Sequence, residues 1–481
     1  MVEVGWLKKD LRLIDNTVLN ELSKDSNNAK ILLFCFEPSI INSKNYSNRH
    51  WRFALESLKE LKQRLLNYGC HLHILEGEIE DVLDFLFQKF NGMRLYSHLE
   101  IGDSATFERD KKVKKWCEKN EVEWKEFYQN GIIRGLKKRT LWSDNWEKFM
   151  SQNIDNINFN HLKLTVFKEL EERFPLLSDY IREKAIEQIG GEKIALKIFN
   201  SFLQKNGSGY SSNISKPQNS KVFCSRLSPY LSWGCISIRF VVQETSKTIS
   251  SSRYKRDLLN FKSRLHWHCH FIQKLESEPK IEFQNQNTAY NKIRNTLNDS
   301  YFTAWKTGQT GVPLVDAAMR CVNKTGYINF RLRAMLISFW TYNLFQPWQP
   351  AAEHLAKQFL DFEPGIHFPQ VQMQAGTVGY HTMRVYNPTL NAKKHDSNAV
   401  FIKKWVPELN NLPIHFAICP WEMTQMEGIM YDFELGKNYP KPIVNIDESA
   451  KKAKVLVYQI KTSHEAKINA SKISKKHVNR K

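Results

Sequence analysis

The sequence predicts an α/β domain followed by an all-α domain, and three observations support this prediction. The chain has 481 residues, which is too long for a single hydrophobic core. Short apolar runs alternate with amphipathic segments through the first 130 residues, as they do in βαβ proteins. From about residue 225 onward the strand pattern nearly disappears, and apolar residues recur with helical spacing. We therefore expect two domains of different class.

The first domain begins with an apolar run directly after the first methionine. Five strands are expected, at residues 2–7, 29–38, 71–77, 94–100 and 122–127. Helices are expected between them, at residues 49–67, 78–90 and 104–120. This alternation implies right-handed crossovers and a mostly parallel, Rossmann-like sheet. No G-x-G-x-x-G motif follows the first strand, so the standard dinucleotide fingerprint is missing.

The rest of the chain is divided by its composition. Residues 131–205 form an interdomain connection with some helix, and the stretch rich in Ser, Asn and Gly at 204–221 is the clearest loop. Long helices are expected at 256–276, 312–324, 331–345 and 351–362. Pro313 lies where a helix should begin, and Gly326 lies where it should end. The predicted division is 1–130 for the α/β domain, 131–205 for the connection, 206–450 for the helical domain and 451–481 for a basic tail.

The charge balance favours a polyanionic partner. The net charge is +20 and the pI is about 9.4, so nucleic acid is a more favoured partner than a membrane surface. The tail at 451–481 holds ten Lys or Arg and one acidic residue, yet the remaining residues still carry +11. The tail is expected to be solvated, or else to be an accessory segment that binds nucleic acid.

Cysteine spacing and the N-terminus point to a cytoplasmic protein. The eight cysteines are scattered and no C-x-x-C occurs, which fits buried, reduced thiols and no zinc finger or iron–sulfur cluster. The N-terminus lacks the apolar region of a signal peptide, and no apolar run is long enough to span a bilayer. We expect a cytoplasmic monomer with no membrane contact.

The stretch "CSRLSPYLSWG" at 224–234 is a candidate phosphate site. Ser228 is expected to cap a short helix, with Pro229 at its first position and Gly234 just past its end. Ser225 adds a second hydroxyl one turn earlier. A loop that leads into a helix N-terminus exposes N–H groups that can hold phosphate. The alternative is an ordinary capped turn.

Two other groups could carry chemistry. Arg333 opens an amphipathic helix, and Asp361 and Glu363 end another, so an Arg333–Asp361 pair is either a buried pair with a purpose or an ordinary surface pair. His266 and His270 are one helical turn apart and could share a metal. A third ligand is missing, so a polar wall of a ligand pocket is favoured and no metal site is predicted.

Taken together, these stretches resemble the cryptochrome/DNA photolyase family over nearly the whole chain. The motifs "VGWLKKDLRLIDNTVL", "CSRLSPYLSWG", "AWKTGQTGVPLVDAAMR", "RLRAML" and "MRVYNPTLNAKKHD" followed by "FIKKWVPEL" occur in family order. The resemblance implies an N-terminal antenna domain and a helical domain that binds FAD in a folded form. It also implies a second antenna chromophore of the folate or deazaflavin type in some members.

The resemblance assigns roles to individual residues. Positions that match the family's FAD phosphate contacts are Tyr210, Ser225, Leu227 and Ser228. Arg333 and Asp361 match the pair that packs on the isoalloxazine ring, and Glu363 matches a second acidic contact. His367 takes the place of the asparagine that faces flavin N5. Trp348 matches the middle member of the family's electron-transfer tryptophans, whereas Val371 and Asn295 replace its partners, so Trp340, Tyr342 and Trp405 are alternative candidates.

Substitutions fall where the family contacts damaged DNA. Asn329-Phe330-Arg331 replaces His-Asn-Arg, and "HWHCHF" replaces the family's Trp-Arg-Glu-Phe stretch. The implied DNA-facing residues are Trp267, His268, His270, Phe330, Arg331 and Asn391.

Three functions are weighed. The favoured one is a FAD-dependent, light-driven DNA photolyase that splits pyrimidine dimers. The alternative is a cryptochrome-like blue-light photoreceptor with FAD and little or no repair activity. A redox flavoprotein without a role for light would need a nicotinamide site, and no fingerprint for one is visible.

Overall fold

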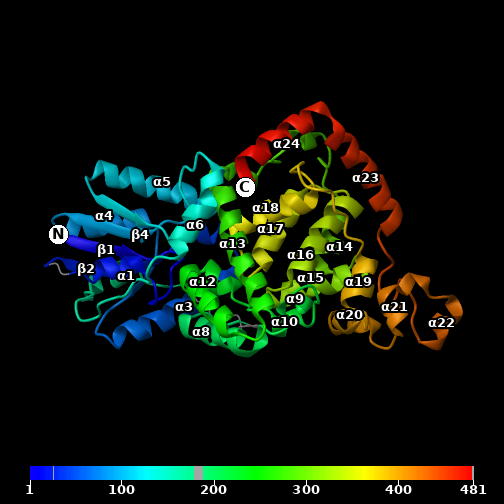
Figure 1. Ribbon diagram of the computed structural model, residues 1–481, viewed down its shortest axis with the longest axis horizontal. Helices are drawn as coiled ribbons and strands as arrows, with labels where there is room; N and C mark the ends of the chain where they lie inside the picture. The colour runs from blue at the N-terminus through cyan, green and yellow to red at the C-terminus, as the bar shows by residue number, and fades with distance from the viewer. Residues whose placement is uncertain (25–26, 178–187, 479–481) are drawn as a thin grey trace.

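The N-terminal part of the protein is an α/β body and the rest is almost entirely helical (Figure 1). The computed structural model describes residues 1–24, 27–177 and 188–478. The predicted fold class is confirmed. In the described part of the chain, no helix is long and apolar enough to cross a bilayer. All eight cysteines are free thiols.

The five predicted strands form one parallel sheet in the order β3-β2-β1-β4-β5. The strands are β1 (Val2–Trp6), β2 (Ala29–Phe36), β3 (His73–Glu76), β4 (Met93–His98) and β5 (Glu123–Phe127). The central strands β1 and β2 are buried along nearly their whole length, as expected for a sheet covered on both faces. The register places Val4 opposite Ile31 on one side and Leu95 on the other.

The helices of this body follow the prediction closely. They are α3 (Asn48–Leu66), α4 (Ile79–Lys89) and α5 (Ser104–Lys119). In α3 the side chains of Phe53, Leu58, Leu61 and Leu65 are at most 1% exposed, so the predicted apolar face is the packed one. The short α1 (Thr17–Leu22) and α2 (Pro38–Ile41) were not predicted, because six and four residues give too few turns for a periodic signal.

The stretch predicted to be the interdomain connection, residues 131–205, contains α6 (Trp142–Met150), α7 (Lys168–Arg173) and α8 (Glu192–Ser201). The predicted loop at 204–221 is partly wrong. It contains most of a π-helical turn (Phe202–Asn206), α9 (Tyr210–Asn213) and α10 (Ser220–Phe223). The carboxylate of Asp257 accepts hydrogen bonds from the backbone N–H groups of Gly209 and Ser211, each at 2.8 Å. This distant carboxylate stabilises the turn, so a local composition rule could not predict it.

The helical domain is built on long helices that pack around a core. They include α12 (Ile238–Ser251), α13 (Lys255–Ser277), α14 (Asp299–Thr307), α15 (Pro313–Thr325), α16 (Phe330–Ser338), α17 (Trp348–Gln358), α18 (Pro364–Ala375) and α19 (Pro388–His395). Pro313 begins α15 and Gly326 caps it with a φ of 72°, as predicted. The predicted single helix at 331–345 instead changes to a π-helical turn at Phe339–Asn343.

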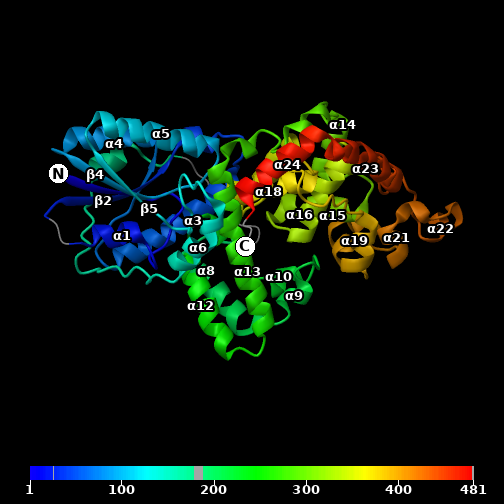
Figure 2. The same ribbon diagram turned by 45° about the horizontal axis from the view of Figure 1, so that its top comes forward.

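The C-terminal segment forms two helices, α23 (Ile446–Thr462) and α24 (His464–His477), which run along the helical domain in both views (Figures 1 and 2). Val457 and Ile473 are buried, and the amide of Asn287 donates to the carbonyl of Ala466 at 2.9 Å. The expectation of a solvated tail is therefore wrong. The tail presents most of its lysines outward and packs its apolar side against the domain.

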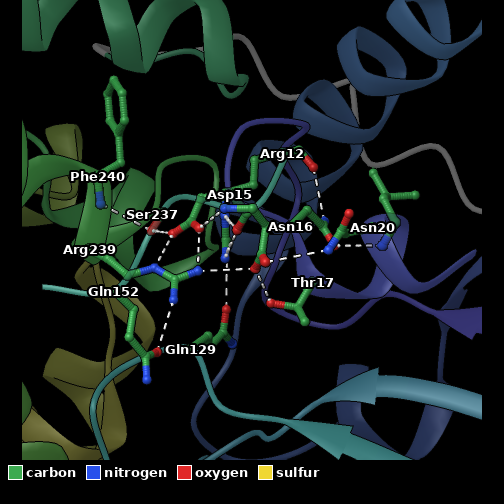
Figure 3. Close-up of polar contacts among 12 residues, drawn as sticks. Arg12, Asp15, Asn16, Thr17, Asn20, Gln129, Gln152, Ser237, Arg239 and Phe240 are labelled. Atoms are coloured by element: carbon green, nitrogen blue, oxygen red, sulfur yellow. Dashed lines mark hydrogen bonds and ion pairs between the residues drawn. The ribbon is translucent and has the colours of Figure 1, made fainter. Parts of the chain in front are cut away.

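A buried polar network joins the two parts of the chain (Figure 3). The Asp15 carboxylate accepts hydrogen bonds from Ser237 Oγ and from Nε and Nη2 of Arg239. The Arg12 guanidinium donates to the carbonyls of Asp15 and Gly234 at 3.0 Å each. The loop after β1 is thereby fixed to the segment that follows residues 224–234.

Candidate functional site

The stretch predicted to hold phosphate forms α11 (Ser228–Ser232). Leu227 rather than Ser228 is the N-cap residue, and Pro229 is the second helical residue, so the predicted cap is displaced by one position. Gly234 follows the helix with a φ of 63°, as predicted. A Cβ atom on Gly234 would lie 2.0 Å from the carbonyl oxygen of Lys9, so only glycine fits there.

Arg226, within the same stretch, lies over the ring of Tyr327. Its guanidinium carbon is 3.5 Å from the ring centroid. The side chain of Gln188 holds this arginine at both ends, because it accepts from Arg226 Nη2 at 2.6 Å and donates to the Arg226 carbonyl at 2.9 Å. Arg226 has a φ of 55°, which is uncommon for a residue with a side chain. The conformation directs a fixed positive charge at Tyr327.

The predicted Arg333–Asp361 pair is present. Both oxygens of Asp361 accept from Arg333 Nη2, at 3.0 and 2.9 Å, and Arg333 Nε donates to the carbonyl of Ile328 at 3.0 Å. The guanidinium carbon lies 4.0 Å from the ring centroid of Phe359. The Asp361 side chain is only 6% exposed, so the pair is not an ordinary surface ion pair.

Tyr327 connects the stretch at 224–234 to the Arg333–Asp361 pair. The Arg333 guanidinium carbon lies 5.8 Å from the centroid of the same ring that Arg226 covers. Burial raises the pKa of Tyr327 to about 12, and the charges that act on it include Arg226, Arg333 and Asp361. Tyr327 carried no recognisable signal in the sequence, because it lies between a helix cap and a helix start. Its role depends entirely on tertiary position.

Tyr210 and His268 lie around the same centre. Burial raises the pKa of Tyr210, whose neighbours include Arg264 and Tyr327. Burial lowers the pKa of His268 to about 4, and the Asp361 carboxylate opposes that shift. His268, Tyr327 and Asp361 lie deep in the domain yet keep some accessible surface. We call the region around these side chains, Arg226 and Arg333 the hollow.

This hollow fits a flavin dinucleotide in its chemistry. Arg226 and the hydroxyls of Ser225 and Ser228, which are close to it in sequence, suit a diphosphate. The planar pair of Arg333 and Asp361 suits a flat, polar ring system that accepts and donates hydrogen bonds. The aromatic rings of Tyr327 and Phe359 supply apolar walls.

Glu363 and His367 occupy the two ends of the first turn of α18. The pKa of Glu363 is raised to about 7 by burial, and the groups that act on its carboxyl, Lys9, Glu100 and Asp103, belong to the α/β body. His367 Nε2 lies 2.8 Å from the carbonyl oxygen of Ala352, and burial lowers the pKa of this histidine to about 4. Glu363 thus lies near the domain boundary, whereas His367 is a neutral neighbour of the Arg333–Asp361 pair.

The predicted DNA-facing residues separate into two groups. Trp267 on α13 is 44% exposed and Phe330 at the start of α16 is 49% exposed. Arg331 follows Phe330 in sequence, and its guanidinium carbon lies 5.5 Å from the Tyr386 ring centroid. Asn391 is in α19, where its amide donates to the carbonyl of Asn387 at 2.8 Å.

His270 packs against Trp267, with ring centroids 5.0 Å apart, but lies on the side of α13 away from His268. Two residues along an α-helix correspond to about 200° of rotation, so His268 and His270 point to opposite sides of α13. His270 Nδ1 lies 2.8 Å from Arg139 Nη2, against the ring of Trp142. His266 contacts Ser143 and the same Trp142 ring. The shared-metal interpretation of His266 and His270 is therefore unsupported, because an arginine already contacts His270.

Trp348 begins α17 and is buried, with its indole N–H donating to Asn285 Oδ1 at 2.7 Å. It lines a polar cavity of about 240 Å³ together with Asn295, the residue in the outer tryptophan's place. Trp340, one alternative candidate, packs 5.1 Å from Trp305 between ring centroids, and both are fully buried. Trp305 was not predicted as a partner.

A smaller cavity of about 40 Å³ lies at the carboxyl edge of the sheet, between Trp6, Trp51 and Arg109. Arg109 fills much of this edge through ion pairs with Glu37 and Glu100. Ligand pockets for cofactors typically measure about 300–1,000 Å³. A second chromophore at this edge would require these side chains to move.

Known proteins resemble both halves of the chain. A family model described as DNA photolyase matches residues 3–135, and one described as the FAD-binding domain of DNA photolyase matches residues 261–459. The chain is 28% identical over 469 residues to a deoxyribodipyrimidine photo-lyase of Alkalihalophilus pseudofirmus, covering 93% of this chain and 96% of that protein. It is 26% identical over 507 residues to cryptochrome-2 of Arabidopsis thaliana, covering 97% and 79%.

A solved structure of an archaeal photolyase from Sulfolobus tokodaii superposes with a TM-score of 0.79 at 27% identity, covering 95% of this chain and all of that one. That structure is described as holding two FAD molecules, with the implication of a novel light-harvesting cofactor. A parallel α/β domain joined to a helical FAD-binding domain defines the present protein as a flavoprotein. The chain belongs to the cryptochrome/DNA photolyase family.

Proposed function

We propose that this protein is a FAD-dependent, light-driven DNA photolyase that splits pyrimidine dimers. The observation that carries the proposal is the exposure of Trp267 and Phe330, two large aromatic side chains on α13 and α16. Each lies within one helical turn of a residue that faces the flavin hollow, His268 and Arg333 respectively. Exposed aromatic rings beside such a hollow suit a base that has left the helix stack.

The cofactor contacts follow from the geometry of the hollow. Ser225, Ser228 and the backbone at Leu227, with Arg226 and Tyr210 beside them, would hold the FAD diphosphate. Arg333 and Asp361 would lie against the isoalloxazine ring. When bound and reduced, FAD supplies the electron for dimer splitting under light, so the residues are needed for position and electrostatics rather than for proton transfer.

The two residues of α18 would tune this environment. His367 stays neutral at physiological pH because burial lowers its pKa to about 4, so it adds no charge beside the ring. Glu363 is largely protonated below about pH 7, because burial raises its pKa to about that value. Trp348 would carry electrons toward the flavin from the side of the polar cavity that it lines.

DNA binding would combine stacking with phosphate contacts. Phe330 and Trp267 would pack against the flipped lesion, with His268 at the entrance to the hollow. Arg331 and Asn391 would contact the strand next to it. Extrusion of a damaged pair costs less than extrusion of an intact one, which favours the lesion. The net charge of +20 suits binding that weakens as salt rises.

The test is a repair assay with the purified, FAD-loaded protein after chemical reduction. Oligonucleotides with a single cyclobutane dimer or a single (6–4) product are incubated in blue light or in darkness. We expect repair of one of the two lesions in light only. Phe330→Ala should lower repair at least tenfold, whereas Phe107→Ala, at an exposed phenylalanine of α5, should not change it. Equal repair in light and darkness, or none with fully reduced flavin, would falsify the proposal.

A second function, a cryptochrome-like photoreceptor, is favoured by the docked C-terminal helices. The side chains of His477 and Lys476 in α24 both contact the Glu278 carboxylate. A light-driven change of charge in the domain could alter such a contact without any DNA substrate. This alternative predicts no repair of either lesion, together with a light-dependent increase in proteolysis within residues 446–477.

A further inference from the structure

An imidazole–carboxylate cluster lies at the edge of the sheet, away from the flavin hollow. His71 and His73 precede and begin the edge strand β3, and Glu171 comes from α7 of the interdomain connection. Side chains two residues apart on an extended chain point to the same face, so the two imidazoles lie together. Their ring centroids are 4.5 Å apart.

Both imidazoles converge on one carboxylate oxygen. His71 Nε2 lies 2.8 Å from Glu171 Oε1, and His73 Nδ1 lies 3.2 Å from the same atom. One ligand atom from each of the three residues falls within 4.8 Å of the other two. Ligand atoms on one tetrahedral zinc ion lie about 3.3 Å apart, since each bond is about 2.0–2.2 Å long. Small movements of the half-exposed Glu171 would therefore complete such a site.

A second observation, the buried and unpaired Nδ1 of His73, also indicates a bound cation. His73 is fully buried, and its Nδ1 makes no hydrogen bond although it points at the Glu171 carboxylate. Its other nitrogen, Nε2, lies 3.2 Å from the carbonyl oxygen of Thr165 and 3.3 Å from the backbone N–H of Phe167. In the tautomer that donates the Nε2 proton to Thr165, the Nδ1 lone pair faces the Glu171 carboxylate, and a cation bound by both would satisfy them.

We propose that His71, His73 and Glu171 bind one zinc ion, with water as the fourth ligand. Two imidazole nitrogens and a carboxylate oxygen are a donor set that zinc accepts, and the partial exposure of Glu171 leaves room for the water. The ion would link β3 to the interdomain connection, which already runs along this edge through the hydrogen bond from Thr165 N to the Lys30 carbonyl at 2.7 Å. The role is structural and is independent of the proposed repair activity.

The ammonium group of Lys62 competes with a metal ion for the Glu171 carboxylate. Its Nζ lies 3.5 Å from Glu171 Oε1, and both side chains are partly exposed. Zinc at the cluster would repel this ammonium group, so Lys62 must move when the ion binds. Removal of the lysine charge is therefore expected to tighten zinc binding, whereas loss of a ligand weakens it.

The experiment uses the full FAD-loaded protein, freed of metal with a chelator and then dialysed against zinc chloride. We expect saturable binding of one zinc ion per chain by elemental analysis, together with a rise in Tm on zinc addition. His71→Ala and Glu171→Gln should each weaken zinc binding at least tenfold, and Lys62→Met should strengthen it. His161→Ala, at an exposed histidine of the same connection, should leave it unchanged.

A spectroscopic measurement separates this site from other histidines. Cobalt in place of zinc should give the visible bands of a four-coordinate ion, at wavelengths beyond the absorption of oxidised flavin. Glu171→Gln should remove these bands while the flavin spectrum stays the same. Absence of saturable zinc binding, or equal binding by wild type and the His71 and Glu171 variants, would overturn the proposal.

Discussion

The buried network around Asp15 offers the sharpest test of how the two domains are joined. We choose Asp15→Asn, because Asp15 has a φ of 59° and asparagine tolerates this conformation better than alanine does. The substitution keeps the shape of the side chain but removes its charge. It also replaces one acceptor oxygen with an NH₂ group that faces the donors of Ser237 and Arg239.

The expected loss in the free energy of unfolding depends on the hydrogen-bond partners that Arg239 retains in the variant. Removal of one partner from a buried ion pair costs about 3–5 kcal/mol when the other charge is left alone. Arg239 still has Asp155 Oδ2 at 3.0 Å and Gln152 Oε1 at 3.3 Å, so the cost should fall below that range (Figure 3). We expect a loss of about 2–3 kcal/mol in the free energy of unfolding, and a fall in Tm of roughly 5 °C.

The pH dependence adds a second criterion. Burial alone would raise the pKa of Asp15, but hydrogen bonds from Arg239 and Ser237 and the charge of Arg12 outweigh it and lower the pKa. The stabilisation is therefore complete above the unfolded pKa of about 3.9 and disappears as the pH falls through the lower folded pKa. The difference between wild type and Asp15→Asn should persist from pH 8 to pH 5 and shrink below about pH 4.

Urea unfolding at pH 7 measures this loss, with FAD release recorded in the same samples. Glu108→Gln, which removes an exposed ion pair with Lys111, is the matched control and should cost less than about 1 kcal/mol. In a double-mutant cycle, Arg239→Gln should cost much less in the Asp15→Asn background than alone. A loss no larger than that of the control, or strict additivity in the cycle, would refute the reasoning.

Three further predictions concern the flavin and the DNA. Arg333→Ala should lower the FAD content of the purified protein at least tenfold, measured by absorbance after denaturation, and full flavin content would contradict the assigned role. Burial raises the pKa of Glu363 to about 7 from its ordinary value of 4.5. Ionisation of this carboxyl therefore lowers the free energy of unfolding as the pH rises from about 4.5 to about 7, and the loss is complete above that pH. Glu363→Gln should therefore gain about 2–3 kcal/mol over wild type between pH 5 and pH 8, and an unchanged difference in urea unfolding would contradict this. Arg331→Ala should reduce by about one the slope of log affinity for damaged DNA against log salt, and an unchanged slope would exclude a phosphate contact.

The α/β half was predicted almost completely from the sequence, because each of its elements leaves a local pattern. The strands at 2–7 and 29–38 are continuous apolar runs, as expected for strands buried on both faces, and the helix at 49–67 has a clear apolar stripe. The parallel order could be inferred because strand–helix alternation permits few topologies. Only the six-residue α1 and the four-residue α2 (Pro38–Ile41) were missed.

The candidate site was predictable only in part. Arg333 and Asp361 could be matched to a family pattern, but composition alone favoured a surface pair. Tyr327 and Phe359, which connect the two walls of the hollow, lie 2–6 residues from predicted positions and have no chemical signature of their own. The opposite orientations of His268 and His270 depend on helix phase, which a motif match does not specify.

The flavin hollow depends on the α/β body as well as on the helical domain. The loop after β1 lies so close to Gly234 that no side chain fits there, and Arg12 holds the carbonyl of the same glycine. Glu363 has Lys9 of that loop among its charged neighbours, and Ser232 Oγ donates to the carbonyl of the adjacent Phe362 at 2.7 Å. The loop at residues 8–16 therefore contacts Gly234 and lies near Glu363, both of which belong to the proposed FAD site. A helical domain expressed alone would lose these contacts, so the two domains should bind FAD as one unit although the family models match them separately.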